Sequence, residues 1–419
     1  MLSRYSTPEM ATLWSDEARY ERWRQVELAV LDARAATDHI DRATIEAAHA
    51  ASAPTPDAVE AEEVRVVHDV VAFLDAWTKP MDVEVASHVH RELTSSDVVD
   101  TAQALAMRDA ARLIDDAVRD LVVVAAERAL EFRDVLCVGR THGQPAALTV
   151  VGHRFADFAH AVNRVRQRLQ ASTVMVAVIT MSGPVGTGAG LAPDLVADIA
   201  HRLNLAVPPV TTQVVFRDGI AAWISDLALL GAVCEAIAID VRLGQHDGVN
   251  ELHEERLNSQ EGSSAMPHKH NPITAENVTG LARVLRGYVT PTLEDIALWQ
   301  HRDISHSSTE RIVIPDAATL AQTITLRTAK LLSGLRVDHD RIRANIERAG
   351  IQLASADRLA QHMASGLRRA EAAANVREEL AADDDRGFDL DASAAEVLQS
   401  AELARIFGRV KTLLEETSP

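Results

Sequence analysis

The chain has 419 residues, too many for one small bundle and enough for two or three packed subdomains. Hydrophobic residues make up 47% of the chain and aromatic residues only 4%, so the apolar content is mostly aliphatic and favours closely packed helices over an aromatic-filled β-sandwich. A net charge of −19 disfavours non-specific binding to nucleic acid or to an anionic membrane, and an anionic ligand would need a local cationic pocket.

The cysteine content and the N-terminus bear on the compartment. Cys137 and Cys234 are the only cysteines, which excludes a disulfide framework and favours a reducing environment. The first twenty residues lack the apolar stretch of a secretory signal, and no segment is expected to be long and apolar enough to span a membrane. We therefore expect a soluble, cytoplasmic protein that binds neither nucleic acid nor membrane.

Apolar residues recur at helical spacing along most of the chain. From about Ile351 the composition shifts to short amphipathic pieces around an acidic run, 383–385, which predicts a separate helical cap. Pro291 and Pro315 are expected to kink or break the helices that contain them. The predicted long helices cover residues 14–36, 97–131, 147–171, 218–256, 273–299 and 308–333.

One segment departs from this helical pattern. Residues 173–190 are rich in β-branched residues and glycine, which predicts a short strand or hairpin followed by a loop. The glycines of 182–190 match neither a dinucleotide fingerprint nor a phosphate-binding loop, so we interpret them as a structural turn.

Residues 93–100, Leu-Thr-Ser-Ser-Asp-Val-Val-Asp, are typical of a helix N-terminus, with hydroxyl groups and an Asp before an apolar helical run. Free N–H groups and the positive end of the helix dipole suit a carboxylate there. As a bare pattern, such a segment is more often only a cap.

A second such terminus is predicted near residue 308. Residues 307–310, Ser-Ser-Thr-Glu, fit a capping box and predict a helix that begins at Ser308. Arg302 and Arg311 flank this start, and two guanidinium groups beside a helix N-terminus suit a phosphate. Two surface arginines paired with neighbouring carboxylates are the alternative interpretation.

Two further segments are rich in groups that handle protons. Residues 259–272, Ser-Gln-Glu-Gly-Ser-Ser-Ala-Met-Pro-His-Lys-His-Asn-Pro, predict an exposed loop between two helices, and residues 140–145 place His142 on a turn. A solvated linker and a structural turn histidine are the alternatives. Neither a zinc site nor a metalloprotease motif has matching ligand spacing, so no metal is expected.

Residues 262–271 resemble the signature of the fumarase/aspartase superfamily, and the resemblance extends from about Ser3 to Gly350. Within the superfamily, the chain resembles the adenylosuccinate lyase family. The segments that carry this closer resemblance are Arg4-Tyr5, His68-Asp69, Thr-Ser-Ser-Asp-Val-Val-Asp-Thr-Ala at 94–102, Arg-Thr-His-Gly-Gln-Pro-Ala at 140–146 and residues 298–316.

This resemblance implies an all-α, three-domain subunit with the domains 1–92, 93–345 and 346–419. The central domain is implied to be a bundle of long helices that joins the common helical core of a homotetramer, with active sites shared between subunits. The implied reaction is the anti elimination of fumarate from a small succinylated amine, without a cofactor. The implied substrates are adenylosuccinate and its imidazole-carboxamide counterpart in purine biosynthesis.

The resemblance also assigns roles to individual residues. Ser263 is the base, with Lys269 stabilising its alkoxide, and His142 is the general acid, oriented by Glu276. Histidine ionises near neutral pH, which suits proton delivery. The carboxylates of the succinyl group are assigned to Thr94, Ser95, Lys269 and Asn271, the phosphate end to Arg4, Tyr5, Arg302, Ser307 and Arg311, and the remaining walls to Asp69, His90, Gln213 and the further catalytic residue His68.

Several positions depart from the family pattern and leave the identity of the amine open. They are Val66-Val67 in place of Thr-Arg, Arg91-Glu92 in place of an aromatic residue and Gly, Gly188 in place of Tyr, Phe216 and Gly219 in a stretch that normally holds a His, and His301 in place of Glu. The alternatives are a fumarate-releasing paralogue for another N-substituted aspartate in specialised metabolism, a cycloisomerase, and an inactive structural paralogue.

Overall fold

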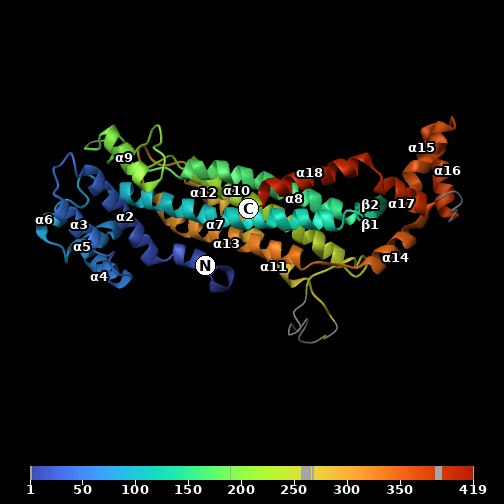
Figure 1. The fold of residues 1–419 in the computed structure, drawn as a ribbon, viewed down its shortest axis with the longest axis horizontal. Helices are drawn as coiled ribbons and strands as arrows, with labels where there is room; N and C mark the ends of the chain where they lie inside the picture. Colours follow the sequence, from blue (N-terminus) through green and yellow to red (C-terminus); the bar gives the residue numbers. More distant parts are fainter. Residues whose placement is uncertain (1, 189, 256–265, 267–268, 383–388, 419) are drawn as a thin grey trace. The chain divides into compact units, whose positions relative to one another are not determined.

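The computed structural model describes residues 2–188, 190–255, 266, 269–382 and 389–418. Its described elements are mostly α-helices, with two small antiparallel sheets, so the all-α prediction is confirmed (Figure 1). Ser263 and the acidic run 383–385 lie outside the described residues.

The chain begins with short helices. A 3₁₀ turn, Ser3–Tyr5, precedes α1 (Pro8–Leu13) and α2 (Asp16–Arg34). The helix predicted from residue 14 starts later, because the Ser15 hydroxyl accepts the Ala18 N–H and fixes the start of α2 at Asp16. The next helices are α3 (Arg42–Ala50), α4 (Pro56–Val66), α5 (Asp69–Thr78) and α6 (Val83–Ala86).

The long helices are α7 (Ser95–Glu131), α8 (Val151–Val176), α10 (Asp218–Gln245), α11 (Ile273–Gly287) and α13 (Ser305–Ser333). The short helices α9 (Pro193–Leu203) and α12 (Val289–Glu294) lie among them in sequence.

The helix predicted over 273–299 is divided, and Pro291 falls in the first turn of α12, where a missing N–H costs little. A break at Pro315 was wrong, since α13 runs through it, and the alternative of a kink stays a prediction. The helix predicted over 218–256 already ends at Gln245.

A hairpin occurs where the sequence predicted the beginning of a helix. Strands β1 (Leu136–Thr141) and β2 (Gln144–Val150) pair antiparallel, and α8 follows β2 directly. The strand predicted within 173–190 was wrong, because α8 continues to Val176 and a single bridge, Val178 to Ala206, follows it. The turn predicted from the glycines is confirmed by the left-handed backbone at Gly183, Gly186, Gly188 and Gly190.

The C-terminal residues form a series of short helices, which confirms a helical C-terminal segment. Strand β3 (Leu252–His253) pairs with β4 (Arg336–Val337), which leads into α14 (His339–Ala349) and the 3₁₀ turn Gly350–Ala354. The last helices are α15 (Ser355–Ala364), α16 (Arg369–Ala381), α17 (Leu390–Leu398) and α18 (Ala401–Thr417).

The chain divides into two compact units. Unit 1 comprises residues 1–116, 165–231 and 282–323, and unit 2 comprises residues 117–164, 232–281 and 324–419. The core of unit 1 includes an aromatic cluster in which the rings of Tyr20, Trp23, Phe73 and Trp77 lie 5.4 to 5.9 Å apart. In unit 2, Phe132 and Phe155 are 5.9 Å apart. The division into domains 1–92, 93–345 and 346–419 stays a prediction.

Helix α10 corrects one expectation from the sequence. It is long and apolar enough to cross a membrane by length and composition alone, although no such segment was expected. Most of its apolar stretch is buried inside the protein, with Trp223, Ile224, Leu227 and Leu230 fully enclosed. Burial of this kind is typical of the core helix of a globular protein.

Candidate active site

The N-terminus of α7 is closely bonded to a neighbouring loop in unit 1. Asp97 accepts the backbone N–H of Thr94 at 2.7 Å and its hydroxyl at 3.1 Å, so the predicted cap is confirmed. The other oxygen of Asp97 accepts the N–H groups of Ser182 and Gly183 at 2.9 and 3.3 Å. Burial raises the pKa of Asp97, which is fully enclosed. This one carboxyl group therefore fixes Thr94 and Ser95 relative to the glycine-rich loop that begins at Ser182.

Two predicted residues connect this terminus to α13. His68 caps α5 through Nδ1, which accepts the Val71 N–H at 3.4 Å, so Nε2 can carry the proton that faces Ser95 Oγ at 3.4 Å. The adjacent residue, Asp69, forms an ion pair with Arg311. Ser95 thus contacts His68, and Arg311 contacts the next residue in the chain, Asp69, all within one unit.

The start of α13 differs from the predicted capping box. The helix begins at Ser305, because Asp303 accepts the Ser305 N–H at 2.8 Å. Arg302 lies just before it and donates from Nη1 to Gln213 Oε1 at 3.1 Å. Among the described residues, Arg302 Nε is buried without a hydrogen-bond acceptor. An open cavity of about 660 Å³ borders this pair and is lined by Pro184, Val185, Gln213, Trp299, Gln300, His301, Arg302 and Asp303.

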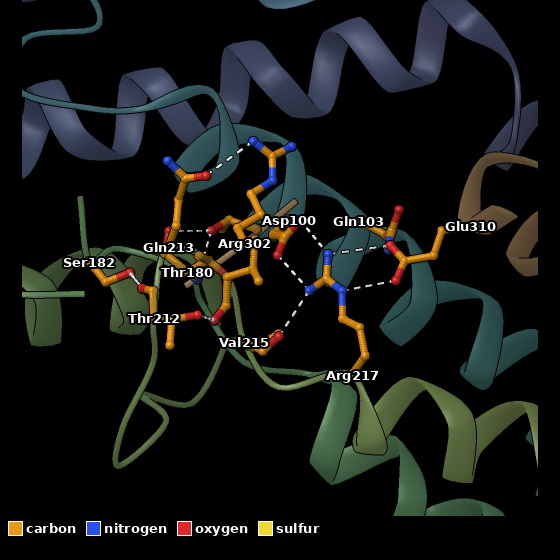
Figure 2. Close-up of polar contacts among 12 residues, drawn as sticks. Asp100, Gln103, Thr180, Ser182, Thr212, Gln213, Val215, Arg217, Arg302 and Glu310 are labelled. Carbon is orange, nitrogen blue, oxygen red and sulfur yellow. Dashed lines mark hydrogen bonds and ion pairs between the residues drawn. The ribbon is translucent and has the colours of Figure 1, made fainter. Parts of the chain in front are cut away.

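Glu310, predicted as a capping residue, instead belongs to a buried ionic cluster (Figure 2). The guanidinium of Arg217 lies between Asp100, which it contacts at 2.7 and 3.0 Å, and Glu310, at 2.9 Å. Gln103 donates to Glu310 at 3.0 Å. These side chains come from α7, the residue before α10, and α13, and all but Gln103 are buried, so the cluster ties the starts of three helices together.

Burial controls the ionisation of this cluster. It raises the pKa of Glu310 to about 7, because lost hydration outweighs the attraction of Arg217, and Asp100 adds repulsion. Burial, reinforced by the charge of Arg217, lowers the pKa of His306 to about 4, so this neighbouring imidazole is neutral at pH 7. The sequence contained no local signal for this cluster.

His142 lies at the tip of the hairpin in unit 2. Thr141 pairs with Gln144, so His142 and Gly143 are the two loop residues, with φ of 53° and 76°. Left-handed backbone at both positions is typical of a type I′ turn, and it leaves His142 exposed. Arg140 secures the hairpin through a bidentate pair with buried Glu251, at 2.8 and 3.2 Å.

Two predicted residues of the signature segment, 262–271, lie within the described residues, just before α11. Lys269 is exposed and Asn271 is half-buried. Glu254 caps α11 by accepting the N–H groups of Thr274 and Ala275 at 3.0 and 2.7 Å, a role that the sequence did not reveal. Glu276, in the first turn, is exposed, and among the described residues no hydrogen bond joins it to His142.

Arg4 and Tyr5 lie apart from Arg302 along α13. The Tyr5 carbonyl accepts the Thr323 hydroxyl at 2.7 Å, which places Arg4 and Tyr5 sixteen residues beyond Ser307 along α13, a separation of about 24 Å. His90 contacts Glu27 at 2.7 Å. The structure therefore groups Ser95, His68, Asp69 and Arg311 and separately pairs Arg302 with Gln213.

Comparison with known proteins identifies the family. A model of the Lyase family matches residues 11–287. The chain is 39% identical over 358 residues to the adenylosuccinate lyase of Archaeoglobus fulgidus, covering 84% of this chain and 80% of that protein. It is 40% identical over 360 residues to the adenylosuccinate lyase of Deinococcus radiodurans, covering 84% and 82%.

Solved structures agree on the fold. The fumarate lyase from Mesorhizobium sp. BNC1 matches with a TM-score of 0.82 and 23% identity, covering 99% of this chain and 98% of that one. The 3-carboxy-cis,cis-muconate lactonizing enzyme from Pseudomonas putida matches with a TM-score of 0.81 and 23% identity, covering 99% and 96%. Because the chain is 39% and 40% identical to two adenylosuccinate lyases, it belongs to the adenylosuccinate lyase family, the carbon–nitrogen lyases of the fumarase/aspartase superfamily.

Proposed function

We propose that this protein eliminates fumarate from adenylosuccinate, leaving AMP, and from the succinylated imidazole-carboxamide ribotide, in purine biosynthesis. The observation that carries the proposal is a pair of contacts in unit 1, Ser95 with His68 and Arg311 with Asp69, made by two residues adjacent in sequence. Through these neighbours, a helix N-terminus that suits a carboxylate lies near one guanidinium group, that of Arg311, which suits a phosphate. A substrate with a succinyl group at one end and a phosphate at the other needs both.

The elimination requires a base, an acid and a site for developing negative charge. Ser263, as its alkoxide, takes a proton from the methylene carbon of the succinyl group. The C–H electron pair forms the double bond of fumarate as the C–N bond breaks, and the C–N electron pair takes a proton from His142. The exposed position of His142 on a two-residue turn supports this role, since the ring is free to enter a cavity.

We further propose that each active site is shared between the subunits of a homotetramer. Tyr5 is anchored about 24 Å along α13 from Ser307, so Arg4 and Arg302 of one chain are poorly placed to hold the same phosphate. The exposed position of His142 fits the same model, because the ring can reach into the site of a neighbouring chain. We expect this enzyme to act in the cytoplasm and to need no metal or cofactor.

The test is fumarate release, followed by absorbance, from adenylosuccinate, its imidazole-carboxamide counterpart and a panel of other N-substituted aspartates. We expect the two nucleotides to be the best substrates by kcat/KM. Release from another aspartate adduct alone would establish the paralogue with a different amine. No release from any of them would contradict the lyase assignment.

A further inference from the structure

The turn before α7 is held by charges on α2 and on the turn that follows α2. Each of residues 90–92 has a polar partner there: His90 lies 2.7 Å from a Glu27 oxygen, Arg91 pairs with Asp38 at 3.4 Å, and Glu92 pairs with Arg34 at 2.8 Å. We refer to these six residues as the α2 clasp. It lies immediately before Thr94 and Ser95, the proposed seat of the succinyl carboxylates.

The backbone of this turn is strained. His90 and Glu92 have φ of 58° and 61°, in the left-handed region that glycine adopts most easily. Such a conformation persists at non-glycine residues only where surrounding contacts fix it. Glu27 supplies one such contact, because it also accepts the His90 N–H at 2.9 Å. The Glu92 side chain contributes a contact that glycine, which adopts this backbone without strain, could not make.

That contribution is a second attachment, to the end of the glycine-rich loop. Arg34 pairs with Glu92 and also donates from Nη2 to the Gly190 carbonyl at 2.9 Å. Glu92 packs so closely on Gly190 that a Cβ there would lie 2.5 Å from Glu92 Oε2. Because Asp97 holds the start of the same loop, Thr94 and Ser95 lie in sequence between two attachments to it.

We propose that Arg34 and Glu92 are positioning residues, whose ion pair fixes Thr94 and Ser95 for the succinyl end of the substrate. The arginine side chain is 6% exposed and the carboxylate 47% exposed, so a buried cation fixes a carboxylate at the surface. The inference rests on the proposed function, because it concerns how the substrate of that reaction is held. Neither residue contacts the reacting atoms.

Two replacements of Glu92 distinguish the effect of the ion pair from the effect of the backbone strain. Glu92→Gln keeps the strained backbone and removes the charge, whereas Glu92→Gly relieves the strain and removes the pair. We expect both to raise KM for adenylosuccinate by about tenfold with kcat within about twofold, because the pair positions the substrate-binding groups. Arg34→Met should do the same, and combining it with Glu92→Gln should add little. Glu84→Gln, at an exposed carboxylate on α6, should leave both constants unchanged.

Two kinetic results would contradict the inference. If Glu92→Gly has the parent KM, left-handed backbone alone suffices and the inference is wrong. A fall in kcat at constant KM is also against it, because loss of folded enzyme would produce that pattern. Amide hydrogen exchange provides a readout without turnover: Glu92→Gln should speed exchange at Thr94–Asp97 and Leu191. Unchanged exchange contradicts the clasp even if the parent protein releases no fumarate, whereas an inactive parent with faster exchange in the variant contradicts only the proposed function.

Discussion

Arg217 and Asp100 form a bidentate ion pair, at 2.7 and 3.0 Å, whose two side chains are 2% and 8% exposed. The pair joins α7 to the residue before α10, and Glu310 extends it to α13. The positions of Ser95 and Arg311 on these helices therefore depend on a group of charges that lies inside the protein.

Removing the cation from this cluster should be strongly destabilising. Arg217→Met leaves Asp100 and Glu310 buried without their counter-ion, and we expect a loss of about 3 to 5 kcal/mol in the free energy of unfolding. Arg166→Met is the matched control, since Arg166 also pairs bidentately with an aspartate, Asp115, at 2.8 Å, but both side chains are more exposed. The control should cost about 1 kcal/mol or less. If a denaturant titration gave similar losses in the free energy of unfolding for the two variants, the buried cluster would have no special role in stability.

The raised pKa of Glu310 predicts a particular pH dependence. Folding raises the pKa of this carboxyl group from 4.5 to about 7. Between these pH values the group keeps its proton in the folded state and has lost it in the unfolded chain. The folded state then binds more protons, so the stabilisation is complete below about pH 4.5 and is lost as the pH rises towards 7. Between pH 5 and 7.5 the parent should lose on the order of 2 kcal/mol more than Glu310→Gln. The measurement is the free energy of unfolding of the parent and of Glu310→Gln against pH, at one protein concentration. Parallel curves for the two proteins would contradict this prediction.

The proposed acid and base can be tested by complementation. Ser263→Ala and His142→Asn should each lower kcat by at least about a hundredfold, and Asn keeps the left-handed turn. If the two groups at a site come from different chains, equal mixing should restore about a quarter of the sites. The assay is fumarate release after co-refolding, with mixed tetramers verified by mass. Recovery no better than either variant alone would place both groups on one chain.

The phosphate end can be tested by product binding. Arg302→Ala should weaken AMP binding by about 2 kcal/mol, as expected for the loss of a charge-assisted contact. Arg343→Ala, on the exposed face of α14, is the control and should leave AMP binding unchanged. Calorimetry on both variants measures the difference. Equal affinities would remove Arg302 from the phosphate site.

Local chemistry made several features predictable. Thr94 and Asp97 form the cap that their spacing indicated, and His142 lies on the predicted turn, because caps and tight turns depend on residues adjacent in sequence. The hairpin itself was missed, since apolar residues after 147 continue into α8 with helical spacing. The shift in register at Gly139 further obscures the alternation typical of strands.

Long-range partners limited the prediction elsewhere. Residues 307–310 satisfy the local rule for a capping box, but Glu310 is paired with Arg217, which is 93 residues away in sequence. In the sequence, Glu92 is only a departure from the family pattern, whereas in the structure Arg34 pairs with its carboxylate. Local spacing cannot reveal either partner.

The turn at the tip of the hairpin also restricts which amino acids position 142 can tolerate. Left-handed backbone at φ 53° admits glycine readily and Asn, Asp or His at modest cost, and it disfavours β-branched residues. Of those four, Gly and Asn cannot deliver a proton, and Asp would be ionised at neutral pH. If His142 is the acid, random substitution at this codon should yield folded hairpins with several amino acids and rapid turnover with histidine alone.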